Sequence, residues 1–375
     1  MLTEFRVKGF KNFENELVFN LQCARDYEFN PETVRDGVVK TGLIYGVNGS
    51  GKSNLGYAIF DIIHHLTDKM QGQPHYNYYR NLDTQNDGID FSYQFKTMGS
   101  TVVYRYTKIA LDTVVEESVS VDGVEVVHYD RNDSGSTCVH LKGAETLNVG
   151  LFDKKMSFLK FVKSNTRLED NATNRAFQGF LEFVDGMLFF AALKDNEFMG
   201  FSSVREFISD RIVESGRLEE LQKFLCANGI NYQLEKVQSS NPDHKWDIGC
   251  KFKNGMADIF RIASRGTGTL MLFFYWVIQM QGTESKPSFV FIDEFDAFYH
   301  SDAARRVVDV LKRLDVQVLL TTHDQTIMDN DLLRPDCYFT LGNGKIAAFS
   351  EMTEKDIRSA HNLQKMYAGG MFREP

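Results

Sequence analysis

One glycine-rich stretch constrains the fold more than any other part of the chain. Residues 46–53 read Gly-Val-Asn-Gly-Ser-Gly-Lys-Ser and match the pattern G-x-x-x-x-G-K-[ST]. Glycines let successive backbone N–H groups point into one concavity, and the helix that follows adds the positive end of its dipole. The pattern therefore predicts a phosphate-binding loop, in which Lys52 reaches the β- and γ-phosphates and Ser53 binds Mg²⁺.

The residues on either side of this loop predict the strand–loop–helix context that it needs. The run TGLIY before the loop is β-prone, and apolar residues recur at near-helical spacing in SNLGYAIFDIIHHL after it. A glycine-rich turn without a ligand is the alternative, and this context argues against it. The residues expected to hold the nucleotide are Gly46, Asn48, Gly49, Ser50, Gly51, Lys52, Ser53 and Asn54.

A second motif, far along the chain, supplies acidic groups. Ser288 to Ile292 form a continuous apolar run, which is typical of a central parallel strand, and Asp293 and Glu294 follow it. There Asp293 would bind Mg²⁺, directly or through water, and Glu294 would polarise the attacking water as general base. The alternative is an acidic turn after a buried strand, which is common in proteins.

Two further stretches carry polar groups at the ends of expected elements. Residues 315–322 predict another buried strand, and His323 just beyond it could contact a γ-phosphate, because ligands collect at the carboxyl ends of such strands. Residues 264–267, Ser-Arg-Gly-Thr, follow a short strand expected at 257–263 and precede an apolar helix. Serine and glycine at a helix start cap helices in any protein, and they also form anion sites.

These motifs together resemble those of an ABC-type ATPase. Residues 46–53 correspond to Walker A, 264–267 to the S-x-G-T signature, FVFIDE to Walker B and TTHD to the switch-histidine loop. The opening LTEFRVKGFKNFENELVFNL resembles the N-terminal hairpin of the SMC, RecF and OLD branch, and DEFDAFYH resembles the DE-x-D-x-x-LH box of OLD-like ATPases. The tail RSAHNLQKMYAGGMF resembles the ending of AbiL-, RloA- and PARIS AriA-type ATPases from phage-defence islands.

The resemblance covers residues 1–110 and 255–375 and implies a P-loop NTPase of ABC type. The implied fold is α/β, with a mixed central sheet, an antiparallel β lobe and a helical insertion. The implied cofactors are ATP and Mg²⁺, and the implied activity is ATP hydrolysis, which can be slow. The roles that the resemblance implies are catalysis for Glu294 and His323, magnesium binding for Ser53 and Asp293, and nucleotide binding for Ser264, Gly266 and Thr267.

The resemblance also implies a head-to-tail dimer in which the signature of one subunit closes on the ATP of the other. A helix N-terminus cannot also fill the Walker site of its own chain when the loop at Gly46 already occupies it. The signature departs from many relatives, because Arg265 stands where they have a small residue. The Q-loop is not distinctive, and its candidates are Gln71, Gln73, Gln85 and Gln94.

Four segments describe the expected domain organisation. Residues 1–150 form the first ABC lobe with Walker A and an antiparallel meander, in which Asp122-Gly123 closes one hairpin. Residues 151–230 predict a compact helical insertion at the place where SMC proteins carry a coiled coil, since no heptad persists. Residues 231–350 form the second lobe, and residues 351–375 form a helical tail.

Composition limits the compartment and the partners. A formal net charge of −9 argues against a generally DNA-coating protein. The five widely spaced cysteines, the charged N-terminus and the shortness of the most apolar run favour a cytoplasmic protein without a membrane span. A basic cluster could contact nucleic acid or an acidic partner, although a solvated helix face is the favoured interpretation; it comprises Lys154, Lys155, Lys160, Lys163 and Arg167.

No effector motif accompanies the ATPase motifs, because the residues after His323 are too few for a Toprim nuclease. The leading hypothesis is therefore an ATP-dependent dimer, or a higher oligomer, that senses or regulates a separate effector protein in antiphage defence. A nuclease would suit as effector, and DNA or a phage protein as trigger. The alternatives are a RecF-like DNA-repair clamp and the nucleotide subunit of a membrane transporter, which the N-terminal hairpin argues against.

Overall fold

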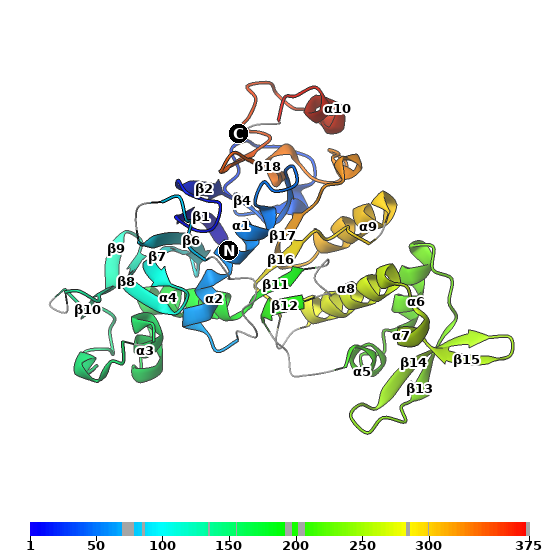
Figure 1. The fold of residues 1–375 in the computed structure, drawn as a ribbon, viewed down its shortest axis with the longest axis horizontal. Coiled ribbons are helices and arrows are strands. Elements are labelled where there is room, and N and C mark those ends of the chain that lie inside the picture. Colours follow the sequence, from blue (N-terminus) through cyan, green and yellow to red (C-terminus); the bar gives the residue numbers. More distant parts are fainter. Residues whose placement is uncertain are drawn as a thin grey trace.

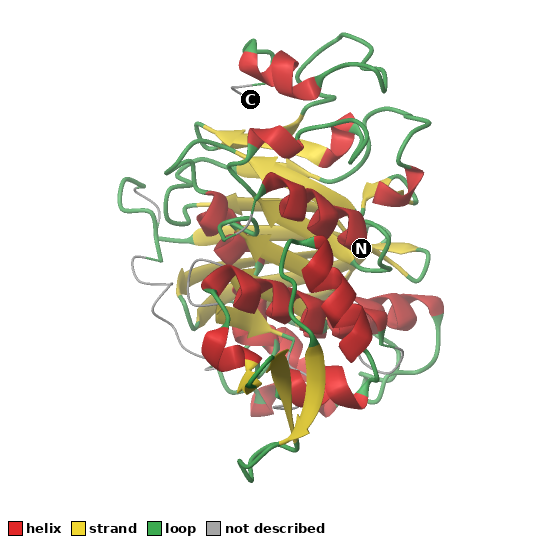
Figure 2. Cartoon of the chain, turned by 90° about the vertical axis from the view of Figure 1, so that its right-hand side faces the viewer, coloured by secondary structure: helices red, strands yellow, loops and turns green. Residues whose placement is uncertain are grey.

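The computed structural model describes residues 1–69, 79–84, 87–133, 136–154, 156–191, 197–201, 207–282, 286–298 and 300–372. In this part of the chain the strands form two seven-stranded sheets, one three-stranded sheet and one pair. The two large sheets lie against each other and helices cover them, as Figure 2 shows with the helices in front of the strands. The α/β class expected from the sequence is confirmed.

The first large sheet is antiparallel and has the strand order β10-β9-β8-β7-β6-β1-β2. Its strands alternate buried and exposed residues, because one face packs on the core and the other meets water. The hairpin between β8 and β9 turns at Asp122 and Gly123, which both have positive φ, as a two-residue type I′ turn requires. The strands are β1 (Leu2–Lys8), β2 (Leu17–Asn20), β6 (Ile89–Thr97), β7 (Ser100–Ala110), β8 (Thr113–Val121), β9 (Val124–Asp130) and β10 (Cys138–Val139).

The second large sheet is mixed and has the strand order β12-β11-β16-β17-β5-β18-β19. Its five inner strands, from β11 to β18, run parallel to one another, and the two edge strands run antiparallel. The inner strands are apolar along their length because both faces are covered. The strands are β5 (Thr41–Tyr45), β11 (Met187–Ala191), β12 (Glu197–Gly200), β16 (Phe289–Asp293), β17 (Gln317–Thr321), β18 (Tyr338–Gly342) and β19 (Lys345–Ala348).

Register in the mixed sheet aligns the ends of its central strands. Ile292 of β16 pairs with Leu320 of β17, which pairs with Leu43 of β5. The carboxyl ends of these three strands therefore emerge at one edge, where β5 leads into the glycine-rich loop. Figure 1 shows β16, β17 and the helix that follows the loop together near the centre of the molecule.

Helices connect and cover these sheets, and a small sheet stands to one side with helices α5 to α8 (Figure 1). The helices are α1 (Lys52–Ile59), α2 (Asp61–Leu66), α3 (Phe158–Asn165), α4 (Ala172–Asp185), α5 (Ile208–Glu214), α6 (Leu218–Ala227), α7 (Ile259–Ile262), α8 (Arg265–Gln281), α9 (Ser301–Leu311) and α10 (Leu363–Ala368). The small sheet is β13 (Leu234–Gln238), β14 (Trp246–Phe252) and β15 (Gly255–Asp258), and the pair is β3 (Val34–Arg35) and β4 (Val38–Val39). None of the helices in the described ranges combines the length and apolar character needed to cross a bilayer.

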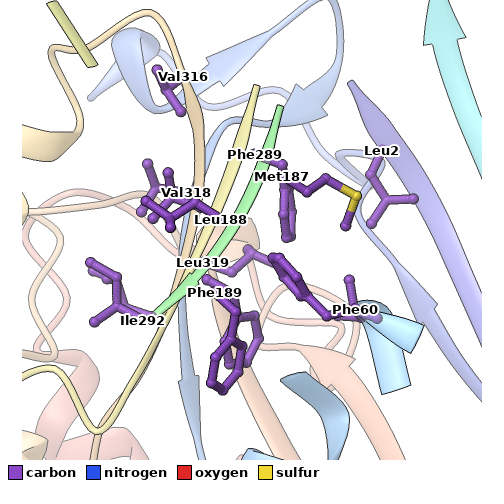
Figure 3. Close-up of a cluster of buried hydrophobic side chains, with 14 of the residues drawn as sticks. Leu2, Phe60, Met187, Leu188, Phe189, Phe289, Ile292, Val316, Val318 and Leu319 are labelled. Carbon is purple, nitrogen blue, oxygen red and sulfur yellow. The ribbon is translucent and has the colours of Figure 1, made fainter. Parts of the chain in front are cut away.

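The core lies where the mixed sheet meets its covering helices and the first strand of the antiparallel sheet. Figure 3 shows Phe60, Met187, Phe189 and Phe289 gathered beside β11 and β16, with Leu2 approaching from β1. A Cβ on Gly56 of α1 would lie 2.6 Å from the ring of Phe189 and 2.7 Å from that of Phe291. Only glycine at this position lets α1 lie so close to the sheet.

Three expectations from the sequence need correction. The segment 151–230 is not helical throughout, because β11 and β12 belong to the mixed sheet. A strand buried on both faces has no alternation, so MLFFA looks like part of a buried helix. The strand expected at 257–263 ends at Asp258, and α7 begins at the next residue, Ile259. The helix expected after the glycine-rich loop breaks at Phe60 into α1 and α2.

Candidate nucleotide-binding site

The glycine-rich loop leaves β5 at Tyr45 and returns into α1 at Lys52. Within it, the backbone N–H of Ser50 donates to the carbonyl of Val47 at 3.1 Å. Gly49 has φ 81° and Gly51 has φ 102°, in the left-handed region that residues with a Cβ seldom adopt. The two glycines therefore permit the tight return that a phosphate-binding loop needs.

The first hairpin touches this loop through Asn12, in the turn between β1 and β2. The Asn12 amide donates to the carbonyl of Ser50 at 3.4 Å, and its oxygen accepts from the side chain of Asn54 at 2.6 Å. A Cβ on Gly51 would lie 2.4 Å from Nδ2 of Asn12. In the sequence, this turn is distinguished only by its resemblance to the N-terminal hairpin of the SMC, RecF and OLD branch. Its contact with the loop joins the two large sheets at the candidate site.

The ammonium group of Lys52 lies against the backbone of the first residues of the loop. Its Nζ donates to the carbonyls of Gly46 at 2.8 Å and Val47 at 3.3 Å, and lies 3.5 Å from Nδ1 of His323. Burial lowers the pKa of Lys52, although the carboxylates of Glu294 and Asp293 oppose that shift. An ammonium group partly stripped of water gains strongly from an anionic partner, which suits a residue that meets phosphate.

Ser53 and Asp293 meet across the gap between α1 and β16. The hydroxyl of Ser53 donates to Oδ2 of Asp293 at 2.6 Å, and Thr321 donates to Oδ1 of the same carboxylate at 2.7 Å. Mg²⁺ prefers hard oxygen ligands and is usually bound by one or two carboxylates together with water and phosphate oxygens. The Ser53 hydroxyl and the Asp293 carboxylate supply such ligands side by side, so the residues present fit Mg²⁺.

Glu294 follows Asp293 in an unusual backbone conformation. Its φ is 49°, in the left-handed region, which costs a residue with a Cβ on the order of 1 kcal/mol or more. Its backbone N–H donates to Oγ1 of Thr321 at 2.7 Å, and its carboxylate lies 3.6 Å from Nε2 of His323. The conformation turns Glu294 away from the strand direction and towards the end of β17. Thr321, which nothing in its own segment of the sequence distinguishes, thus contacts both acidic residues.

A third acidic residue, Asp296, lies in the same turn as Glu294. Asp296 accepts a hydrogen bond from the hydroxyl of Thr322, and burial raises the pKa of its carboxyl. Thr322 is fully buried, and its hydroxyl accepts from the backbone N–H of Asp324 at 2.9 Å. These bonds tie the turn after β16 to the turn after β17. The sequence signal was present in TTHD, where two threonines precede His323.

The Ser264–Thr267 segment forms the start of α8. Ser264 is the N-cap, and its Oγ accepts from the backbone N–H of Thr267 at 3.2 Å. A Cβ on Gly266 would lie 2.5 Å from the carbonyl oxygen of Phe298, so the turn after β16 packs directly on the helix start. This contact links the segment to the same turn that carries Asp293 and Glu294.

A pocket of about 480 Å³ opens at this helix start. Its wall includes Ser264, Gly266 and Thr267 at the start of α8, together with His300, the N-cap of α9, and Arg306 in the middle of α9. None of the residues that line it comes from the loop at 46–53. The structure therefore divides the expected site residues into two groups on one chain. The loop, Asp293, Glu294 and His323 form the first group, and the start of α8 forms the second.

Several sequence-level candidates lie elsewhere or outside the described residues. Gln94 is on β6 of the antiparallel sheet, while Gln71, Gln73 and Gln85 fall outside the described ranges. In the basic cluster, Lys160 pairs with Asp68 and Lys163 with Asp185, and Lys155 is not described. Two of the cluster's charges are thus balanced within the chain.

Comparison with solved structures identifies the fold. An SMC head domain with an extended coiled coil, bound to the C-terminal domain of ScpA and derived from Pyrococcus furiosus, matches with a TM-score of 0.50. The two chains are 11% identical, and the match covers 92% of this chain and 96% of that one. The chain has the P-loop fold of an ABC-type ATPase head. The fold class expected from the sequence is confirmed, including its mixed central sheet and antiparallel lobe.

Two other SMC heads match over similar lengths. The SMC head domain from Thermotoga maritima is 15% identical, with a TM-score of 0.44, and covers 92% of this chain and 97% of its own. An SmcHead bound to the C-winged helix domain of ScpA is 16% identical, with a TM-score of 0.46 and the same coverage of both chains. These identities are too low to carry an activity from one protein to the other.

A sequence family matches part of the same ABC-type head. Residues 151–329 match the family described as "AAA domain, putative AbiEii toxin, Type IV TA system". The matched range contains the start of α8, Asp293, Glu294 and His323, and it begins after the loop at 46–53. No curated protein matches the chain. The family match includes the middle segment, where the resemblance in the sequence was weakest.

Proposed function

We propose that this ABC-type head binds ATP with Mg²⁺ and hydrolyses it. The observation that carries the proposal is the convergence of Lys52, Ser53, Asp293 and Glu294 at the ends of β5, β16 and β17. The Ser53–Asp293 hydrogen bond of 2.6 Å and the Lys52–His323 contact of 3.5 Å draw residues from three motifs into one place. Such a set of donors, acids and a cation suits a nucleoside triphosphate better than any other common ligand.

Each group in the site has a role that follows from its position. Backbone N–H groups at residues 49–53 and the start of α1 face the phosphates, and Lys52 exchanges its carbonyl partners for β- and γ-phosphate oxygens. Ser53 and Asp293 hold Mg²⁺, which when bound neutralises charge on the transferred phosphoryl group. Glu294 accepts a proton from the attacking water, and His323 lies between Glu294 and Lys52, where it can hydrogen-bond the γ-phosphate.

The start of α8 completes the site of a second copy in this proposal. The pocket at Ser264, Gly266 and Thr267 is built from a helix N-terminus and contains none of the residues of the chain's own loop. Two copies related by a two-fold axis can each present this helix start to the other's γ-phosphate. Nucleotide then lies in the interface, so ATP favours the dimer and hydrolysis releases it.

We further propose that this ATP-dependent dimer acts in the cytoplasm as a sensor or regulator of a separate effector in antiphage defence. The support is the resemblance of the two termini to defence ATPases. A nuclease is the expected effector class, and DNA or a phage protein is the expected trigger. Co-expression with the neighbouring gene product should reduce phage plating, and Lys52→Ala should abolish that protection.

A RecF-like DNA clamp is the second candidate, because the N-terminal hairpin also resembles that group. The net charge of −9 and the ion pairs of Lys160 and Lys163 with Asp68 and Asp185 argue against it. A clamp would bind duplex DNA only with ATP, and its affinity would fall steeply with salt. A fluorescence-anisotropy titration at two salt concentrations separates the two candidates.

The experiment that tests this proposal measures both the rate of ATP hydrolysis and the molecular mass of the protein in solution. The wild-type protein should release phosphate from Mg·ATP, and release should stop when EDTA removes the metal. Light scattering after size-exclusion chromatography should show a shift from monomer towards dimer when a non-hydrolysable ATP analogue is added. A protein that neither binds ATP nor changes mass would refute the proposed function.

A further inference from the structure

Three charged side chains are fully buried between α2 and the antiparallel sheet. Asp61 of α2 and Lys108 of β7 are 0% exposed, and Glu117 of β8 is 1% exposed. Charged residues are almost never buried to this extent unless they are paired, because removing them from water is costly. None of the three has a role in the proposed hydrolysis, so the reason for burying them lies in what they connect.

Asp61 lies where the helix after the glycine-rich loop breaks. The first part of that helix, α1, ends at Ile59, and Asp61 is the first residue of α2. Its carboxylate accepts hydrogen bonds from the hydroxyls of Tyr79 at 2.6 Å and Tyr106 at 2.9 Å. It also pairs with the ammonium group of Lys108 at 2.8 Å. Asp61 therefore attaches the end of the loop's own helix to the antiparallel sheet.

A second connection reaches Asp61 from the glycine-rich loop, through the first hairpin. Asn12 in the hairpin turn contacts the carbonyl of Ser50 in the loop. The backbone N–H of the preceding residue, Lys11, donates to the carbonyl of Tyr79 at 3.1 Å. Since the hydroxyl of Tyr79 donates to Asp61, both the helix that follows the loop and the hairpin turn that contacts it meet at this carboxylate.

His65 lies one turn after Asp61 on α2 and begins a chain of hydrogen bonds that leaves the helix. Residues four apart share one face of a helix, so both side chains face the sheet. Nε2 of His65 lies 2.8 Å from the hydroxyl of Tyr104 on β7, which in turn donates to Oε1 of Glu117 on β8 at 2.7 Å. All three side chains are buried, so water does not compete for these bonds.

Glu117 ends the chain at the first turn of α3. Its Oε1 accepts from the hydroxyl of Ser157, the N-cap of α3, at 2.7 Å. Its Oε2 accepts from the backbone N–H groups of Phe158 at 2.6 Å and Leu159 at 3.3 Å. These N–H groups have no partner within the helix, so the carboxylate holds the turn in place. Figure 1 shows α3 at the end of the antiparallel lobe, on the opposite side of the molecule from α8 and α9.

We propose that this buried chain, which runs from Asp61 and His65 through Tyr104 and Glu117, transmits ATP occupancy of the glycine-rich loop to α3. The inference rests on the proposed function, because ATP must bind the loop. Bound ATP restrains the loop and α1, so α2 moves less and the first turn of α3 opens less often. The surface around α3 then differs between the free and the ATP-bound protein, and a partner that binds there can respond to nucleotide.

Hydrogen exchange measured by mass spectrometry tests this transmission in the full-length chain. The protein is compared with and without Mg²⁺ and a non-hydrolysable ATP analogue, at a concentration at which it stays monomeric. Peptides that cover residues 46–54 report binding at the loop, and peptides that cover 157–165 report α3. The analogue should slow exchange in both, by about threefold or more at the first turn of α3.

Tyr104→Phe removes the hydroxyl that joins His65 to Glu117 and leaves the ring in place. The analogue should still protect the loop, but the ratio of exchange rates at α3 with and without it should fall close to one. A hydroxyl that only stabilised the fold would change both rates by the same factor and leave the ratio unaltered. His65→Leu breaks the chain one bond earlier and makes the same test if Tyr104→Phe does not fold.

Tyr129→Phe is the matched control. Tyr129 is 4% exposed, and its ring stacks on that of Phe158 in α3 with centroids 5.3 Å apart. Among the described residues its hydroxyl has no hydrogen-bond partner, so it lies beside α3 but outside the chain. Removing this hydroxyl should leave the protection of α3 by the analogue unchanged.

The outcomes separate this inference from the proposed function. If the analogue protects the loop of the wild type but not α3, or protects α3 equally in Tyr104→Phe, the chain does not transmit occupancy and the proposed function stands. Equal loss of protection in Tyr129→Phe would also overturn the assignment. If the analogue protects neither the loop nor α3, ATP binding fails, and the inference fails with it.

Discussion

The hydroxyl of Ser53 donates a hydrogen bond of 2.6 Å to Asp293, a residue 240 positions away in the chain. Ser53 stands in the first turn of α1, and Asp293 is the last residue of β16. The bond closes the gap between the glycine-rich loop and the acidic strand end, where β17 contributes Thr321 as a third partner. The proposed magnesium site is therefore one that the fold assembles before nucleotide arrives.

The loop lysine gives the first prediction. Lys52→Ala removes the charge that would neutralise the β- and γ-phosphates, and charge-assisted hydrogen bonds of this kind contribute about 1.5–3 kcal/mol each. ATP affinity should fall by at least about tenfold, and turnover should fall with it. Isothermal titration and phosphate release measure the two effects. The matched control is Lys345→Ala, which removes a lysine from an exposed position on a strand. If both variants bound ATP equally well, the loop would not be part of the ATP-binding site.

The acid after Asp293 gives the second prediction. Glu294→Gln should keep ATP and Mg²⁺ bound while slowing hydrolysis by about 10²–10⁴-fold, the usual contribution of a general base. The amide keeps the shape of the side chain but cannot accept the proton. The variant should accumulate as an ATP-bound dimer, visible by light scattering. Wild-type turnover in this variant would show that another group activates the water.

Thr321 gives the third prediction, because its hydroxyl donates to the carboxylate of Asp293 and accepts from the backbone N–H of Glu294. Thr321→Val leaves the partly buried backbone N–H of Glu294 without its acceptor, which costs at most about 1–3 kcal/mol of stability and loosens the turn at Glu294. The rate of hydrolysis should fall while ATP affinity changes little. Thr321→Ser retains the hydroxyl and should restore most of the rate. A valine variant as active as the serine variant would show that this hydrogen bond does not position Glu294.

Two histidines on α2 should make the free energy of unfolding depend on pH. Burial lowers the pKa of His64 from 6.5 to about 4, and burial also lowers the pKa of His65 well below its ordinary value. Between pH 6.5 and 4 the unfolded chain therefore binds more protons than the folded chain, so the free energy of unfolding falls as the pH drops. The slope reaches about 1.4 kcal/mol per pH unit for one histidine.

Urea titrations at pH 7 and pH 5 measure this loss of stability. Between pH 7 and pH 5 the His64→Gln variant should lose less stability than the wild type. It lacks the histidine that binds a proton in the unfolded chain but not in the folded chain. Well above pH 6.5, His64 is neutral in both the folded and the unfolded protein, so the wild type and the variant should show the same pH dependence there. An equal loss for both proteins below pH 6.5 would contradict the burial of a neutral His64.

The parts of the fold that the sequence predicted well are those with strong local signals. TGLIY, SFVFI and DVQVLLTT are apolar runs that end in polar residues, and all three are parallel strands of the mixed sheet. The meander at 91–130 alternates cleanly, because one face of its sheet meets water. The glycine-rich loop and the acidic pair were recognisable because their chemistry needs fixed residue types at fixed spacing.

The parts that the sequence did not predict depend on contacts between distant residues. MLFFA was read as helix because a strand buried on both faces carries no alternation, and only its pairing with β16 shows what it is. Asn12 and Thr321 are ordinary polar residues in their own segments. Their importance comes from neighbours more than 25 positions away, Ser50 for Asn12 and Asp293 for Thr321, which tertiary folding brings within hydrogen-bonding distance.

In the proposed dimer, the loop at Gly46 of one subunit and the start of α8 of the other make one active site. Two inactive variants test it. Lys52→Ala destroys the loop side, and Ser264→Arg blocks the helix side with a large exposed side chain at the N-cap, so each homodimer carries two broken sites. A mixed dimer places both lesions in one site and leaves the other intact.

The most direct measurement is therefore the ATPase rate of the two variants mixed in equal amounts, after each is shown to be folded and mixed dimers are shown to form. Mixing should restore hydrolysis, to at most about half the wild-type rate per mixed dimer if the two sites act independently. A rate that stays at zero would contradict independent composite sites. Hydrolysis by a strictly monomeric wild-type protein would contradict the shared site altogether.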